Sequence, residues 1–209
     1  MAVITISRQS GSQGNEITCI LCERLSYSYF DKKMMAQLAT ELGWDPEKIE
    51  DRSADTHHAK TFLDQIFINF QAPFGPSTAE FRRAQYVERE LLNVAQAKHL
   101  ILSAYEHGNV VIVGRGSQVV LAGKPGVLHV RVVAPLDKRI ETWQSRQVLS
   151  YEEARRLVRE RDKAHKDFVE VYFDADLNDC SLYDLVVNTN QLIPEDAADV
   201  IIAALEKIK

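Results

Sequence analysis

The sequence predicts an α/β fold built on a doubly wound parallel sheet, and three observations indicate it. Residues 2–7 read as a buried strand, and after a glycine-bearing turn residues 15–26 carry apolar side chains at helical spacing. Residues 109–114 (NVVIVG) form a continuous apolar run, which is typical of a strand buried on both faces. Strand patterns then alternate with helix patterns, as parallel strands joined by crossover helices require. With 209 residues, we expect one domain spanning 1–209.

The remaining elements follow in chain order. Residues 27–30 read as a short strand, after which Asp31 could cap a helix that runs to about Leu42. From residue 45 to 76 the hydrophobic pattern is lost, and this polar stretch, which ends in the turn-rich QAPFGPST, looks inserted. The later elements that the patterns predict are a helical region at 79–107, strands at 127–133 and 185–187, and helices at 135–147, 151–166 and 194–208.

Composition argues against several classes of protein. The formal net charge is −5 and the pI is about 5.7, whereas a general nucleic-acid binder needs a basic surface. The sequence has no apolar segment long enough to span a bilayer and no secretory signal, so we expect a cytoplasmic protein with no membrane or nucleic-acid partner. Cys19 and Cys22 form a CxxC pair without a second pair, and Cys180 is distant, so neither a structural zinc site nor a disulfide framework is expected.

The turn SRQSGSQGNEI, residues 7–17, lies where a phosphate-binding loop would lie. Between a first strand and a first helix, glycines let backbone N–H groups converge on an anion, and Gly11 and Gly14 are placed for this. In an ordinary P-loop a lysine and a Ser or Thr follow the last glycine, whereas Asn15 and Glu16 follow it here. The pattern favours phosphate binding, and the alternative is a plain glycine-rich turn.

Two further basic segments could serve the same anion. Arg115 lies directly after the most apolar strand, so it leaves the sheet at the carboxyl edge, where a guanidinium can grip a phosphate. The alternative is an exposed loop arginine. Positive charges also load the predicted helix at 151–166 and its exit: Arg155, Arg156, Arg159, Arg161, Lys163 and Lys166. Alone, such a run predicts a solvated helix face, but beside a phosphate pocket it suits a closing lid.

Longer segments carry a resemblance to a known family. They are ITISRQSGSQGNEI, YFDKKMM, VIVGRGSQVVL, LHVRVVAPLDKRIE, and RDKAHKDF with the downstream NDCSLYDLVVNT. On these segments the chain resembles the cytidylate kinase-like family of P-loop kinases over nearly its full length. The resemblance implies a three-layer α/β P-loop kinase fold with a parallel sheet, an acceptor-binding helical insertion, placed here at 45–85, and a lid segment at 155–180.

The resemblance also implies roles for individual residues. It places the phosphate loop at Arg8, Ser10, Gly11, Ser12, Gln13, Gly14 and Asn15. It assigns the acceptor phosphate to Arg115 between Gly114 and Gly116, with help from Arg82 or Arg83. Asp31 falls where these kinases have an aspartate near the metal and the acceptor, and Arg161 and Asp162 begin the lid's Arg-Asp motif. Catalytic roles are expected for Arg8, Arg115, Arg161, Lys163 and Lys166.

The loop departs from the family pattern at two positions. The family's loop often reads like REYGSGGREI, so Gln13 replaces a glycine and Asn15 replaces the loop arginine. Loss of one preorganised charge-stabilising donor costs about 3 kcal/mol, or about a hundredfold in rate, unless Arg8 or a lid cation takes over. Gln13 would be strained if its position requires a positive φ, and the loop would then have to follow a different path.

These inferences predict a phosphotransferase that uses ATP and Mg²⁺ to phosphorylate a nucleoside monophosphate, with CMP or dCMP expected. Mg²⁺ would enter with ATP, and Asp31 is the candidate residue to organise it. Two alternatives stay open: a nucleotide-binding regulatory protein with little or no turnover, and a kinase of a non-nucleotide metabolite. The expected partners are small-molecule nucleotides, and apolar positions in the region 79–107 could equally serve the core or a homodimer interface.

Overall fold

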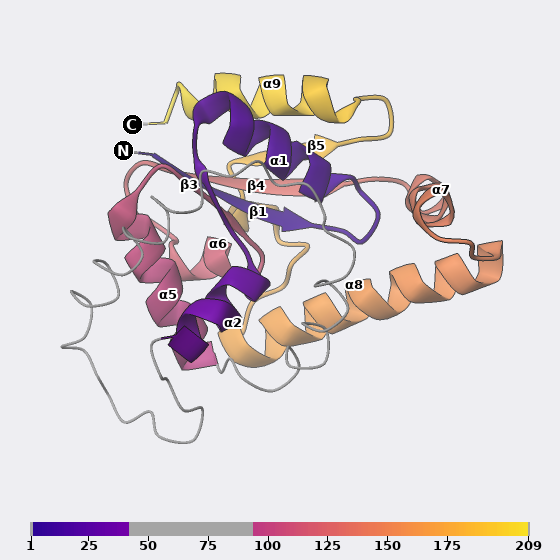
Figure 1. The fold of residues 1–209 in the computed structure, drawn as a ribbon, viewed down its shortest axis with the longest axis horizontal. Coiled ribbons are helices and arrows are strands. Elements are labelled where there is room, and N and C mark those ends of the chain that lie inside the picture. Colours follow the sequence, from indigo (N-terminus) through magenta and orange to yellow (C-terminus); the bar gives the residue numbers. More distant parts are fainter. Residues whose placement is uncertain (1, 42–93, 209) are drawn as a thin grey trace.

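The centre of the molecule is a parallel β-sheet. A computed structural model of the chain describes residues 2–41 and 94–208. Its strands are β1 (Val3–Arg8), β2 (Ser28–Phe30), β3 (Val110–Val113), β4 (Val127–Val133) and β5 (Leu185–Asn188). They form one five-stranded sheet in the order β2-β3-β1-β4-β5, with all neighbours parallel (Figure 1). Strand β1 is therefore central, and the chain leaves it at the carboxyl edge of the sheet.

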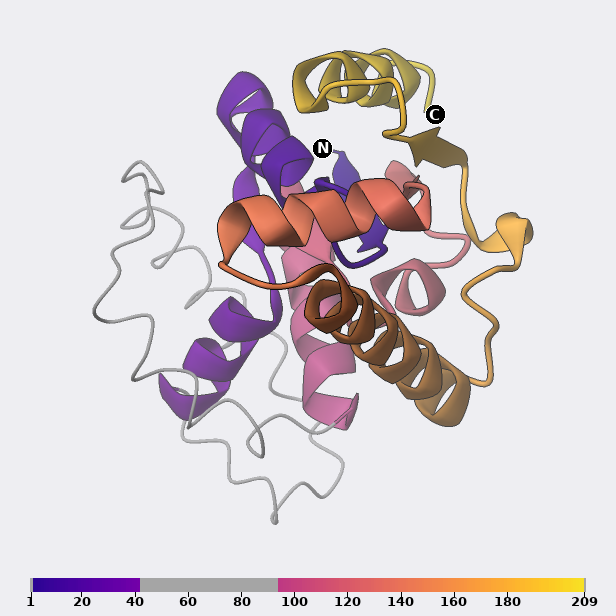
Figure 2. The same ribbon diagram turned by 90° about the vertical axis from the view of Figure 1, so that its right-hand side faces the viewer.

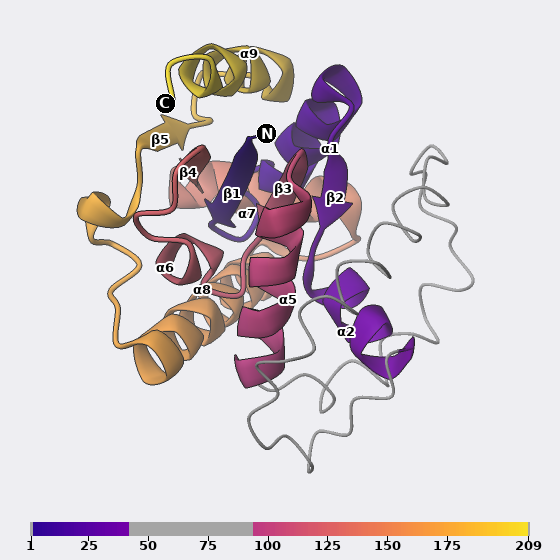
Figure 3. The same cartoon turned by 90° about the vertical axis from the view of Figure 1, so that its left-hand side faces the viewer.

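Helices cover both faces of the sheet (Figures 1 and 3). Helices α1 (Gly14–Leu25) and α9 (Pro194–Leu205) pack together on one face. The opposite face carries α2 (Lys32–Glu41), α5 (Val94–His107), the short α6 (Ser117–Val120) and the long α8 (Tyr151–Phe173). Helix α7 (Leu136–Arg146) lies beyond the carboxyl ends of the strands and packs on α8 (Figure 2). The predicted three-layer α/β arrangement is thus confirmed.

Alternating side chains along the strands build the core. Ile4 and Ile6 of β1 pack in a buried cluster with α1 and α9, whereas Val3 packs with α2 and α5 on the other face. Toward the carboxyl edge this second face changes from apolar to polar. The polar residues of β1 and β4 that lie there are Thr5, Ser7, His129 and Arg131, and all four are buried.

Helices α7 and α8 form a smaller unit with its own apolar contacts among Ile140, Trp143, Ala154 and Val158. Helix α8 begins with a capping box, in which Ser150 Oγ accepts from Glu153 N (3.3 Å) and the Glu153 carboxylate accepts from Ser150 N (2.8 Å).

Helix α8 continues beyond the predicted end at about residue 166, to Phe173. Val169 is fully buried and Phe173 packs against Gly116, so these two residues extend the packed stripe of the helix. Asp174 then takes a left-handed conformation (φ 50°) and ends the helix.

Within the described residues the other predicted elements are confirmed with small shifts at their ends; of the predicted helical region 79–107, α5 confirms 94–107, and residues 79–93 lie outside the described residues. Asp31 caps α2 as expected, because its Oδ1 accepts from Lys33 N (2.9 Å) and Met34 N (3.1 Å). The sequence patterns missed α6 and a 3-10 helix at Cys180–Leu182, which are too short to show a periodicity. The proposed insertion at 45–85, including Arg82 and Arg83, lies outside the described residues.

The three cysteines are free thiols. Among residues 2–41 and 94–208, no three His, Cys, Asp or Glu side chains group as metal ligands would. Within those same ranges, no helix combines the length and the apolar character that a membrane span requires.

Candidate functional site

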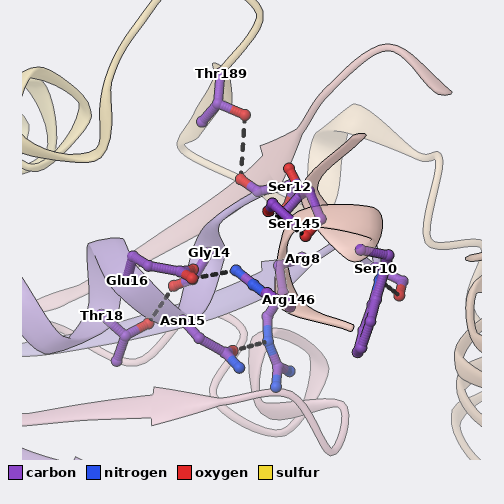
Figure 4. Close-up of polar contacts among 12 residues, drawn as sticks. Arg8, Ser10, Ser12, Gly14, Asn15, Glu16, Thr18, Ser145, Arg146 and Thr189 are labelled. Atoms are coloured by element: carbon purple, nitrogen blue, oxygen red, sulfur yellow. Dashed lines mark hydrogen bonds and ion pairs between the residues drawn. The ribbon is translucent and has the colours of Figure 1, made fainter. Parts of the chain in front are cut away.

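The loop between β1 and α1 is tied to the ends of two neighbouring strands. Gln9 N donates to Val132 O (3.1 Å), and the Gln9 side chain accepts from Ala134 N (3.1 Å). Thr189 Oγ1, which follows β5, donates to Ser12 O (3.1 Å; Figure 4). The loop backbone is therefore fixed by the carboxyl edge of the sheet, as a preformed anion site requires.

Both loop glycines are needed for close approach. A Cβ on Gly11, whose φ is +83°, would lie 2.5 Å from the backbone oxygen of Arg139, and a Cβ on Gly14 would lie 2.7 Å from Arg8 Cβ. Gln13 takes a left-handed conformation (φ 60°, ψ 16°), so the position does require a positive φ, and Gln13 adopts it rather than avoiding it. Such a conformation costs a residue with a Cβ roughly 1–2 kcal/mol. The loop is thus packed and strained, unlike an ordinary surface turn.

Arg8 contacts Asn15, the residue that stands where the family's loop often has an arginine. Its Nε donates to Asn15 Oδ1 (3.0 Å; Figure 4), and a Cβ on Gly114 would lie 3.1 Å from its Nη1. The side chain therefore runs from the first loop to the loop after β3. Burial lowers the pKa of Arg8, while Tyr29 and Asp31 act in the opposite direction, and the guanidinium stays charged.

Asp31 lies at the end of β2, near Arg8. One of its oxygens caps α2, and the other accepts from Tyr29 OH (3.2 Å). Burial, followed by the charge of Asp31, raises the pKa of Tyr29. Oδ1 already accepts two hydrogen bonds, whereas Oδ2 accepts one among the described residues, so Oδ2 keeps the capacity to bind a hydrated cation while Asp31 caps the helix.

The loop after β3 turns left-handed over three residues, Gly114 (φ 74°), Arg115 (φ 57°) and Gly116 (φ 70°). Helix α8 packs directly on this turn. The Arg115 guanidinium lies 5.0 Å from the centre of the Phe168 ring, and a Cβ on Gly116 would meet the Phe173 ring at 2.6 Å. Arg115 is therefore held by α8 at the carboxyl edge of the sheet, where the sequence places it.

One face of α8 also contacts the first loop. Asp162 Oδ1 accepts from Ser10 N (2.8 Å), and its other oxygen pairs with the buried Arg139 of α7. Arg161 stacks on the Trp143 ring at 4.2 Å, and Trp143 Nε1 donates to Ser10 Oγ (3.0 Å). Asp162 thus contacts the loop directly, and Arg161 reaches it through Trp143, while their role in a lid stays a prediction.

The two lysines of the expected lid lie elsewhere. Lys163 pairs with Asp167 on the exposed side of α8, and Lys166 is exposed as well. Residues 162 and 165 share the inward face of the helix. Lys163 lies about 100° around the helix from Asp162. Lys166 lies at the edge of that face, is exposed and does not line the cavity beside the loop. In this conformation the structure therefore does not bring Lys163 or Lys166 to the loop.

Two cavities flank the loop. One, of about 330 Å³, lies against α7 and is lined by Gly11, Gln13, Ala134, Lys138, Glu141, Thr142, Ser145 and Thr189. The other, of about 240 Å³, is lined by residues 8–16, by Trp143 and Arg146 of α7, and by Arg161, Asp162 and His165 of α8. All the predicted loop residues border one cavity or both, so the glycine-bearing turn is the wall between two hollows.

Three residues near these cavities were missed from the sequence: Arg131, Arg139 and His165. Arg139 is buried and donates from Nε to Ala134 O (3.0 Å), so it fixes the start of α7 against the loop. His165 lines the second cavity. A charged residue inside the apolar run VLHVRVV was a usable signal for Arg131, and the spacing of four residues from Arg161 was one for His165.

The parallel sheet, with a glycine-bearing loop between its central strand and first helix, defines an α/β protein of the P-loop class. The chain belongs to the cytidylate kinase-like family, whose sequence profile matches residues 3–191.

Individual proteins agree with this assignment. A cytidylate kinase from Haloarcula marismortui is 33% identical over 98% of this chain and 89% of its own length. A cytidylate kinase from Sulfolobus acidocaldarius is 36% identical over a shorter region, which covers 38% of this chain and 44% of that protein. The crystal structure of an uncharacterised protein from Eubacterium ventriosum matches with a TM-score of 0.71 and 17% identity over 99% of both chains, which supports the fold.

Proposed function

We propose that this protein is an ATP-dependent phosphotransferase that moves the γ-phosphoryl group to a nucleoside monophosphate, CMP or dCMP. Membership of the cytidylate kinase-like family supports a kinase. The observation that carries the proposal is the position of Arg8, between the glycine-bearing loop and the Arg115 loop. A fixed charge between donor and acceptor loops is what phosphoryl transfer needs, because its catalysis consists mainly of positioning and charge stabilisation.

The donor side would be the loop from Ser10 to Asn15. Backbone N–H groups of Gly11 to Gly14 are the proposed ligands of the ATP phosphates, and Arg8 replaces the missing loop cation. The cavity of about 330 Å³ on the α7 side has room for the donor's base. Mg²⁺ would neutralise the phosphate oxygens when bound, and Asp31 is the residue proposed to hold it through water, with its Oδ2.

The acceptor side would be the Arg115 loop. Arg115 is proposed to grip the acceptor phosphate, with its backbone held by Gly114 and Gly116. Helix α8 is proposed as the lid, in which Arg161 covers the transferred group and excludes water. Arg82 and Arg83 stay candidates for the same phosphate, and Lys163 and Lys166 can contribute only if α8 turns or shifts.

Phosphorus NMR of the purified protein with Mg·ATP and CMP, dCMP, UMP or AMP tests the proposal. The expected result is ADP together with CDP or dCDP. Arg115→Ala should reduce the rate a hundredfold or more, since it removes a charge-stabilising group, while Arg24→Ala on α1 should leave the rate unchanged.

Absence of any diphosphate product from folded protein would contradict the proposal. ATP-dependent thermal stabilisation without turnover would then favour the regulatory nucleotide-binding protein, because binding to the native state alone stabilises it. ADP formation only with a non-nucleotide acceptor would favour the metabolite kinase.

A further inference from the structure

Arg131 is a buried cation on the face of the sheet that α8 covers. It lies on β4 opposite Ser7 of β1, and only 8% of its surface is exposed. Two residues earlier on the same strands, Thr5 lies opposite His129, and Thr5 Oγ1 is hydrogen-bonded to His129 Nδ1 at 2.8 Å. Two consecutive cross-strand pairs are therefore polar at positions where a covered sheet face is normally apolar.

Among residues 2–41 and 94–208, the contacts of Arg131 include no counter-charge. Its Nη1 donates to Ser7 Oγ (2.6 Å), and its guanidinium lies 5.7 Å from the centre of the Tyr183 ring. Neither partner is an anion, and in the described part of the chain no carboxylate forms an ion pair with Arg131. A buried guanidinium without a counter-ion is costly, so a charge from a ligand would complete this site.

His165 identifies the place on which the cations converge. Its pKa is lowered to about 4, first by burial and then by the charges of Arg131, Arg8 and Arg115, while a backbone hydrogen bond to Arg8 acts in the opposite direction. The Nε2 atom of this ring is buried and has no hydrogen-bond partner among the residues that the structure describes. Arg8 and His165 both line the 240 Å³ cavity. Arg131 and Arg115, from two further segments, lie close enough to His165 for their charges to act on its ring, so three guanidinium groups face this imidazole at the border of the cavity.

The geometry points to Arg131 and His165 as phosphate-binding residues that, with Arg8, form the seat of the acceptor's phosphate monoester. This inference rests on the proposed function for the identity of the ligand. A phosphate dianion has three terminal oxygens, which can accept from the forked donors of the guanidinium groups, and its charge would favour protonation of His165, so that Nε2 could donate to it as well. Arg115, which is proposed to grip the acceptor phosphate, is one of the charges that act on His165, so we assign the seat to the acceptor.

Titration calorimetry of Arg131→Met and His165→Gln with CMP, cytidine and inorganic phosphate tests the seat. Each variant should bind CMP and phosphate about tenfold or more weakly, because charge-assisted hydrogen bonds are lost, and should bind cytidine as the unmodified protein does. Arg24→Met is the matched control, since it removes the same charge from α1, and it should bind CMP normally.

A second readout reports on His165 itself. In protein with ¹⁵N-labelled histidine, CMP or phosphate should shift the His165 Nε2 resonance, and cytidine should not. Unchanged CMP affinity in folded Arg131→Met and His165→Gln would overturn the inference, as would a protein that binds neither CMP nor phosphate. CDP formation alongside such unchanged affinities would leave the proposed function standing, whereas Arg131-dependent phosphate binding without any turnover would support the seat and refute the kinase.

Discussion

Replacing Gly11 by alanine tests how tightly the loop is packed against α7. Gly123 offers a matched control, because it also has a positive φ (+72°) but has nothing within 4 Å of the position of a Cβ. At Gly11 (φ +83°) the same Cβ would lie 2.5 Å from Arg139 O and 3.0 Å from Arg139 Cα. Both substitutions pay the left-handed strain, and only Gly11→Ala adds a clash with backbone.

The expected magnitudes follow from these two contributions. Left-handed strain costs about 1–2 kcal/mol for a residue with a Cβ, partly offset by the lower entropy of the unfolded alanine chain. Overpacking adds about 1–3 kcal/mol, and backbone cannot move aside as a flexible side chain can. Gly123→Ala should therefore lower the free energy of unfolding by about 1 kcal/mol, and Gly11→Ala by about 2–4 kcal/mol.

Guanidinium denaturation followed by circular dichroism measures both losses, and comparable slopes for the two variants make the comparison valid. In thermal melts the difference of about 2 kcal/mol corresponds to roughly 4–8 °C between the variants for a protein of this size. Equal losses for Gly11→Ala and Gly123→Ala would refute the packing of the loop against Arg139, and with it the geometry of both cavities.

Three further predictions concern the same region. The native His165 pKa of about 4 lies below the ordinary 6.5, so the unfolded chain takes up the proton first. The free energy of unfolding of the unmodified protein should therefore fall by up to about 3 kcal/mol as the pH drops from about 6.5 to 4. His165→Gln should remove this loss, as measured by urea titrations at several pH values. Gln13→Gly should raise the free energy of unfolding by up to about 1 kcal/mol, since left-handed strain is removed at some entropic cost; an unchanged or lower urea midpoint would count against it. Asp162→Asn should destabilise by about 1–3 kcal/mol because Arg139 loses its ion pair, while Asp167→Asn, at an exposed pair, should cost under about 0.5 kcal/mol by the same assay.

The fold could be predicted well because its signals are local. An apolar run such as NVVIVG and a helical spacing such as that of residues 15–26 need no information from distant residues. The positions of Gly11 and Arg115 at one edge of the sheet could also be predicted from the sequence, because each residue lies just after a strand and parallel strands end at the same edge.

The rest of the site depends on register and on helix phase. Arg131 becomes a candidate site residue only because β4 pairs with β1 in the register that sets it opposite Ser7, 124 residues away. Charged residues occur all along α8, so the sequence does not show which side of the helix faces the loop. Lys163 and Lys166 were therefore predicted to lie at the site, whereas His165, which lines the cavity, was missed. No local pattern reports how α8 is rotated against the loop.

The carboxylate of Asp162 already occupies one N–H of the loop, that of Ser10. An outside anion that takes this N–H has to expel the carboxylate, so its apparent dissociation constant exceeds the intrinsic one by the reciprocal of the fraction of molecules in which Asp162 has withdrawn. With about one molecule in a hundred undocked, affinity would fall about a hundredfold without any change in the loop. The concentration of such an anion that half-saturates the loop would therefore depend on Asp162, which lies 152 positions away in the chain. Substitutions there would change the affinity while the loop glycines stay the same.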